Sequence, residues 1–183
     1  FNQQNIVARL PGTGNYPGTI LMTAHYDSRT IDPFDGASLA PGANDNGSGV
    51  AALLEVARLM SAVTWNHDVV FVAFAAEEIG TRGSAYFVGD RLLDGWQMDA
   101  VINLDIVGGR PGIPQSLRIF SPPPEGSGSR QFARYMDFIG GLYMPTVRLD
   151  LQDSIDRPNR YSDHVPFLDA GIPAIRLTES VED

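Results

Sequence analysis

Three apolar segments of this chain each end in residues suited to acid–base or metal chemistry. The segments are Thr19 to Ala24, Val69 to Ala76 and Val101 to Leu104, and each has the composition of a strand buried in a parallel sheet. They are followed, in the same order, by His25-Tyr26-Asp27, Glu77-Glu78 and Asp105. Because parallel strands present their carboxyl ends at one edge of a sheet, where α/β proteins bind ligands, we expect these side chains to lie together.

Strands and helices are expected to alternate along the chain. Apolar and period-two patterns predict strands at residues 5–10, 19–26, 68–76, 100–107, 117–121, 146–149 and 174–178. Helical spacing predicts helices at residues 48–62, 83–93, 129–139 and 162–170. The residues of the first helix that we expect to face the sheet are Val50, Leu53, Leu54, Ala57 and Ser61. Such alternation is typical of the α/β class.

Length and composition exclude several classes of function. The 183 residues suit one domain of ordinary size. With 13 basic residues, 22 acidic residues and a net charge of -9, the chain lacks the basic patch that usually binds nucleic acid. The absence of cysteine excludes disulfides, thiolate zinc sites and a cysteine nucleophile. No apolar stretch reaches the roughly 18 residues of a membrane span, so we expect neither a nucleic-acid nor a membrane partner.

Two of the three histidines belong to a candidate metal-binding set. Asp45 lies in the glycine-rich segment 41–49, just before a predicted helix whose amino end favours an ionised carboxylate. In chain order, the candidate ligands are His25, Asp45, Glu77 or Glu78, Asp105 and His164. Nitrogen and oxygen ligands without sulfur favour zinc, with cobalt or manganese as substitutes. Three carboxylates and two histidines suffice for two ions bridged by one carboxylate.

The roles within this set follow from local geometry. His25 and Asp27 share a face of an extended strand, so Asp27 is better placed to orient the imidazole than to bind metal. Buried together without a cation, Glu77 and Glu78 would repel each other. One of the two can bind metal while the other faces the reacting water.

Each of these signals has a plainer interpretation. His25 could be a structural histidine, residues 42–49 a phosphate-binding turn, the Glu pair a solvated helix start, and His164 a capping residue. His67 lies in a polar turn and is left out of the set.

Five segments carry a family resemblance. AHYDS, PGANDNGSG, FAAEEIGTRGSAYF, INLDIVG and SDHVPF occur in this order, and together they resemble the M28 family of zinc exopeptidases, in particular its bacterial aminopeptidase branch. The resemblance implies an α/β single-domain three-layer sandwich, with a central mixed, mostly parallel β-sheet flanked by helices. Residues 1–183 are then expected to form one metallopeptidase catalytic domain without the terminal helical segments usual in the family. It also implies a secreted or periplasmic protein.

The resemblance assigns roles to the candidate ligands and to the base, whereas the roles of Asp27 and Tyr161 follow from their positions in the sequence. His25 and Asp105 would bind one zinc, Glu78 and His164 the other, and Asp45 would bridge the two. Glu77 would be the general base and Asp27 would assist catalysis beside His25. A cis peptide is implied between Asp45 and Asn46. Tyr161 could bind substrate by donating a hydrogen bond to the developing oxyanion, although a tyrosine at a loop end more often packs.

These roles lead to a dizinc aminopeptidase that removes amino-terminal residues from peptides. A carboxypeptidase of the same fold is the alternative, and it would need an arginine such as Arg148, Arg157 or Arg160 to bind the substrate carboxylate. A trimmed, non-catalytic M28-like domain is a third hypothesis. The sequence leaves the side-chain preference and the oligomeric state open.

Overall fold

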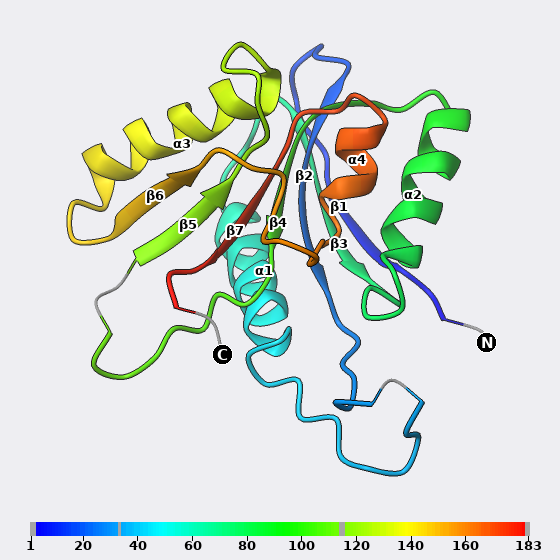
Figure 1. Cartoon of the computed structure of the whole chain (residues 1–183). Helices are drawn as coiled ribbons and strands as arrows, with labels where there is room; N and C mark the ends of the chain where they lie inside the picture. Colours follow the sequence, from blue (N-terminus) through cyan, green and yellow to red (C-terminus); the bar gives the residue numbers. More distant parts are fainter. Residues whose placement is uncertain (1–2, 33, 114–115, 182–183) are drawn as a thin grey trace.

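The computed structural model describes residues 3–32, 34–113 and 116–181, and within them seven strands form one sheet (Figure 1). The strands are β1 (Ile6–Leu10), β2 (Gly18–His25), β3 (Asp68–Phe74), β4 (Gln97–Leu104), β5 (Ser116–Phe120), β6 (Arg148–Gln152) and β7 (Ala174–Glu179). All seven overlap predicted strands. The largest shifts, of three residues, are at both ends of β4 and at the end of β6.

The sheet is mixed and mostly parallel, as expected. Its strand order is β1-β3-β2-β4-β7-β5-β6. Strands β3, β2, β4 and β7 run in one direction, β1 pairs antiparallel with β3, and β5 pairs antiparallel with β7. The carboxyl ends of the four central strands therefore share one edge, and those strands bury residues on both faces.

Helices cover both faces of the sheet, which gives the predicted three layers (Figure 1). The helices are α1 (Gly47–Met60), α2 (Arg82–Leu93), α3 (Gly128–Tyr143) and α4 (Val165–Asp169). Leu53 of α1 and Ala133 of α3 pack in one apolar cluster, whereas Phe87 of α2 and Phe167 of α4 pack in the other. No helix in the described part of the chain is long and apolar enough to cross a membrane.

Two helical predictions need correction. Leu54 is 65% exposed, because the sheet-facing side of α1 is built from Leu53 together with Val50, Val56, Ala57 and Met60. Ser61 lies at the carboxyl-terminal cap and is exposed. The helix predicted at residues 162–170 begins only at Val165, since Ser162 and Asp163 are buried and bonded through their side chains to Asn103 and Ser84.

Candidate metal centre

The predicted site residues meet at the carboxyl edge of the central strands. His25 ends β2, Asp105 directly follows β4, and Glu77 and Glu78 follow β3. Because β2 lies between β3 and β4, these three chain segments are neighbours. A cavity of about 390 Å³ opens there, and the predicted residues that line it are His25, Asp45, Glu77, Glu78, Asp105 and Tyr161.

His25, Asp45 and Asp105 form the tightest cluster of this edge. Nε2 of His25 lies 3.2 Å from Oδ1 of Asp45 and 3.4 Å from Oδ1 of Asp105. One ligand atom from each residue lies within 4.8 Å of the others. Oδ1 of Asp105 is buried and has no hydrogen-bond partner within the described ranges. An imidazole nitrogen facing two carboxylate oxygens, one without a donor, fits a divalent cation such as zinc.

The opposite side of the His25 ring is held by Asp27. Nδ1 lies 3.1 Å from the backbone carbonyl of Asp27 and 3.5 Å from its carboxylate. A proton on Nδ1 would leave Nε2 as the nitrogen that faces Asp45 and Asp105. The Asp27 carboxylate accepts hydrogen bonds of 3.1 Å from the backbone N–H groups of Glu77 and Glu78. Asp27 thus connects the ends of β2 and β3.

Asn46 joins the start of α1 to the end of β4. Its side-chain oxygen accepts from the backbone N–H groups of Gly49 and Ile106, and its amide donates to the carbonyl of Leu104. The two segments approach so closely that a Cβ at Gly49 would lie 2.5 Å from that carbonyl oxygen. Asp45, which precedes Asn46 through a cis peptide as expected, is thereby placed next to Asp105.

Electrostatics distinguish the two glutamates. Burial, reinforced by Asp163 and Asp105, raises the pKa of Glu77 to about 9. Burial and the nearby Asp45 raise the pKa of Glu78 to about 7, although Arg29 opposes this with Nε 2.8 Å from the carboxylate. A bound cation would lower both pKa values by favouring the charged forms.

His25 and Asp105 are shifted towards their charged forms. Burial disfavours a charge on His25, but the carboxylates of Asp105, Asp27 and Asp45 prevail and hold its pKa well above the usual value. Burial likewise disfavours ionised Asp105, yet Arg176 and His25 hold its pKa well below the usual range. In the folded chain these opposite charges stabilise one another at the position where a cation would bind.

His164 lies outside the three-residue cluster. It is fully buried, and its Nε2 lies 2.8 Å from the carbonyl oxygen of Ile155, whereas its Nδ1 has no hydrogen-bond partner in the described part of the chain. Burial lowers its pKa, so the imidazole is neutral, as a metal ligand must be. Glu78 also lies outside the cluster. Neither side chain therefore belongs to the group whose ligand atoms lie within 4.8 Å of one another.

Sequence reasoning did not single out two buried charged residues beside the cluster, Arg176 and Asp156. Arg176 is fully buried in β7, and Nη2 lies 3.1 Å from Oδ2 of Asp105. Its Nη1 donates a 2.5 Å hydrogen bond to Asp156. The available signal was the single arginine in the apolar run from Ala174 to Thr178, since a charge in a buried strand needs a partner.

The arginines proposed for a carboxypeptidase separate into two groups. Arg157 and Arg160 line the cavity of the metal cluster together with Arg29. Arg148 lies at the start of β6, with a side chain that is 79% exposed, and it is not among the described residues that line the cavity. His67 lies before β3, at the opposite edge of the sheet, and stacks on Tyr16.

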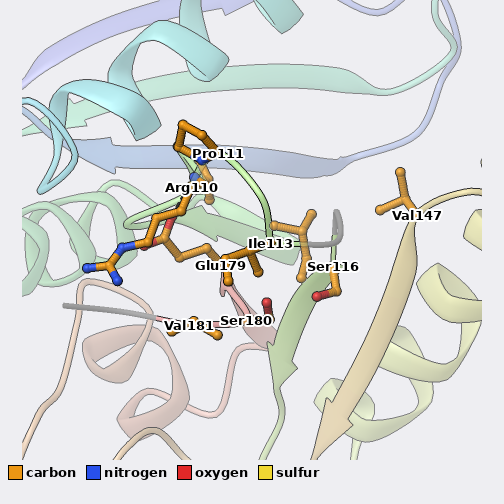
Figure 2. A pocket seen from close by; sticks show the side chains of 12 residues that line it. Arg110, Pro111, Ile113, Ser116, Val147, Glu179, Ser180 and Val181 are labelled. Atoms are coloured by element: carbon orange, nitrogen blue, oxygen red, sulfur yellow. Dashed lines mark hydrogen bonds between the residues drawn. The ribbon is translucent and has the colours of Figure 1, made fainter.

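A second cavity, of about 460 Å³, lies beside the end of β7 (Figure 2). Its described lining comes from residues 107–111, 113, 116–117, 147 and 179–181 and includes none of the predicted site residues. Glu179 is buried at this cavity, and its carboxylate accepts hydrogen bonds from the side chain of Asn44 and the backbone N–H of Gly109. Glu179 therefore holds the segment that carries Asp45 in place, and it is not part of the candidate metal-binding group.

The fold is a mixed α/β sheet with a histidine–aspartate cluster at its carboxyl edge that could hold a metal ion. The chain belongs to peptidase family M28, whose family profile matches residues 5–183.

Similar proteins support this membership. A probable zinc metalloprotease of Leptosphaeria maculans is 32% identical over 202 residues, which cover 98% of this chain and 47% of that protein. Aminopeptidase YwaD of Bacillus subtilis is 32% identical over 188 residues, which cover 98% of this chain and 37% of that protein. The solved structure of BSAP, a zinc aminopeptidase from Bacillus subtilis, superposes with a TM-score of 0.71 at 30% identity, covering 96% of this chain and 39% of that one. The chain thus spans less than half the length of these relatives.

Proposed function

We propose that this chain is the catalytic domain of a dizinc aminopeptidase that removes amino-terminal residues from peptides. The observation that carries the proposal is the cluster of His25, Asp45 and Asp105, in which an imidazole nitrogen and two carboxylate oxygens converge at the edge of a cavity. The similarity to proteins named as a zinc aminopeptidase and as an aminopeptidase supports the same activity.

The proposed ligands divide between two ions. His25 and Asp105 hold one zinc, Glu78 and His164 hold the other, and Asp45 bridges them. Bound zinc would polarise the peptide carbonyl of the substrate and lower the pKa of a bound water. Asp27 keeps the imidazole of His25 in the tautomer that leaves Nε2 free.

Glu77 is the proposed general base. It lines the cavity and forms no salt bridge within the described part of the chain, unlike Glu78, which is paired with Arg29. Its carboxylate takes a proton from the attacking water and later delivers that proton to the leaving amine. The pKa of about 9 in the metal-free chain falls when positive charge enters the site, which moves the group towards the range in which a base works.

Tyr161 is the proposed donor to the carbonyl oxygen of the substrate. It lines the cavity and is 59% exposed, so its hydroxyl is accessible to a bound peptide. A donor directed at developing negative charge stabilises the transition state more than the ground state. The acidic cavity wall also attracts the ammonium group of a peptide amino terminus.

A carboxypeptidase is the second candidate, and one observation favours it. Arg157 and Arg160 line the same cavity as the metal cluster, where a guanidinium group could bind a substrate carboxylate. In the aminopeptidase these arginines would instead contact the peptide beyond its first residue.

The deciding experiment restores zinc to the chelated protein in steps. Bound metal is counted while hydrolysis of leucine p-nitroanilide is followed, with the N-acetylated compound as control. Activity that appears as the metal content approaches two per chain, and only with the free amine, supports the aminopeptidase. Hydrolysis restricted to an amino-blocked dipeptide with a free carboxylate supports the carboxypeptidase. Two bound ions without any hydrolysis indicate a non-catalytic domain.

A further inference from the structure

Among the residues that the structure describes, Arg176 is the one buried arginine, and it lies beside the metal cluster. It is the third residue of β7, a central strand, and its relative exposure is 0%. A guanidinium group at such a position is costly unless carboxylates neutralise it. Two carboxylates do so here, from Asp105 after the adjacent strand β4 and from Asp156 in the segment after β6. The Phe120 ring centroid lies 6.0 Å from its central carbon.

Arg176 contacts only one side of the Asp105 carboxylate. Its Nη2 lies 3.1 Å from Oδ2, close enough for an ion pair but without hydrogen-bond alignment. The other oxygen, Oδ1, lies 3.4 Å from Nε2 of His25 and belongs to the three-residue cluster. The carboxylate thus has one oxygen next to a fixed cation and the other directed at the metal position. An aspartate held in this way offers a metal ion one oxygen rather than two.

The second contact of Arg176 leads to His164. Oδ1 of Asp156 accepts hydrogen bonds from Nη1 of Arg176 and from the backbone N–H of Arg157, at 2.5 and 2.7 Å. Oδ2 of Asp156 is buried, has no hydrogen-bond partner in the described ranges, and lies 3.9 Å from Nε2 of His164. One guanidinium group therefore connects Asp105 with the carboxylate beside His164.

We propose that Arg176 is a positioning residue for the metal centre, which keeps Asp105 a one-oxygen ligand and, through Asp156, holds the segment that carries His164. The proposal rests on the ligand roles given under Proposed function. Its physical basis is preorganisation: a fixed guanidinium holds two carboxylates in place before metal arrives, so less ordering is needed when an ion binds.

The test compares metal binding by three variants that have passed a circular-dichroism check of folding. Arg176→Met removes the charge and keeps an unbranched side chain. Arg176→Lys keeps the charge without the planar guanidinium group. Asp156→Asn removes the negative charge beside Arg176 and His164 but keeps an oxygen that can accept hydrogen bonds. Arg58→Met is the control, because Arg58 is exposed and pairs with Glu55 on the surface of α1. Zinc affinity and stoichiometry are measured by competition with a chelating dye.

The expected results differ between the variants. Arg176→Met should weaken zinc binding about 10-fold or more, the usual effect of removing a residue that supports a ligand, and Arg176→Lys should recover part of that loss. Asp156→Asn should weaken the second zinc more than the first, and Arg58→Met should match the wild type. With Co²⁺ in place of zinc, Arg176→Met should weaken the visible absorption bands, because a two-oxygen Asp105 raises the coordination number.

Wild-type zinc affinity in both Arg176→Lys and Asp156→Asn would overturn the proposal, even if Arg176→Met failed to fold. An unchanged Co²⁺ spectrum in folded Arg176→Met would overturn the one-oxygen role of Asp105. A wild-type chain that binds no zinc would instead overturn the proposed function.

Discussion

The Asp27 carboxylate lies 3.5 Å from Nδ1 of His25, while Nε2 on the other side of the ring faces Asp45 and Asp105. The backbone carbonyl of Asp27 approaches the same nitrogen to 3.1 Å. The carboxylate also accepts the backbone N–H groups of Glu77 and Glu78, so one side chain orients a metal ligand and anchors the segment that carries the base. Asp27 is thus central to the site without facing the metal position.

Asp27→Asn should lower zinc affinity by about 10- to 100-fold, because the imidazole loses a carboxylate partner and the two N–H groups lose a charged acceptor. Competition with a chelating dye measures this change. Asp35→Asn is the matched control, since the Asp35 carboxylate accepts hydrogen bonds from residues of its own surface turn, Ala37 and Ser38. Equal zinc affinity in the two variants would show that the backbone carbonyl alone orients His25.

Glu77→Gln should retain bound metal and lose turnover by about 10²- to 10⁴-fold, because the amide cannot accept the proton of the attacking water. His164→Ala should instead lose one ion per chain. Metal counting together with peptide hydrolysis separates the two effects. Equal metal loss in both variants would contradict the assigned roles.

The metal-free protein should lose stability as the pH rises from 7 to 9. In the folded chain the pKa of Glu77 is about 9, against a usual value of 4.5, so the native state retains a proton that the unfolded chain has released. The raised pKa of His25 acts in the same direction. When the native state binds more protons, the free energy of unfolding falls with rising pH, by at most about 1.4 kcal/mol per pH unit for each proton.

Urea midpoints at pH 7, 8 and 9, with chelator or with zinc, measure this dependence. The lowered pKa values of Asp27 and His164 have the opposite effect only at lower pH, so they leave this window unchanged. With zinc bound, the urea midpoint should fall less between pH 7 and pH 9, because the ion neutralises the same carboxylates. In the metal-free protein, Glu77→Gln should also make the urea midpoint less dependent on pH. A midpoint that rises with pH in the presence of chelator would contradict the assigned charges.

Asn46→Ala should lower the free energy of unfolding by about 2 to 4 kcal/mol. The change removes a helix cap and leaves the backbone groups of Leu104 and Ile106 without their buried partner. Ser127→Ala, which removes the cap of α3 and a part-buried hydrogen bond to the carbonyl of Pro122, should cost about 1 kcal/mol. Equal losses in urea unfolding would mean that Asn46 acts only as a cap and does not join α1 to β4.

Much of the fold could be predicted from local pattern. Strands such as β2 and β3 are predicted from continuous apolar runs, because a strand that is buried on both faces of a sheet needs apolar side chains at successive positions. The predictions for Leu54 and for the start of α4 were wrong, since each depended on contacts from distant segments. Leu54 is exposed because other residues of α1, Leu53 among them, form the side that packs on the sheet. Ser162 and Asp163 are held outside the helix by side-chain hydrogen bonds with Asn103 and Ser84.

The sequence by itself determined the α/β class, the family and the identity of the residues gathered at one sheet edge, since strand composition and motif order are local properties of the chain. Only the tertiary structure decided which of those residues meet. It brings His25, Asp45 and Asp105 within 4.8 Å, leaves Glu78 paired with Arg29, and buries Arg176 between Asp105 and Asp156. The reason is that strand order and side-chain packing bring together residues far apart in the chain, and a buried charge obtains its partner only there.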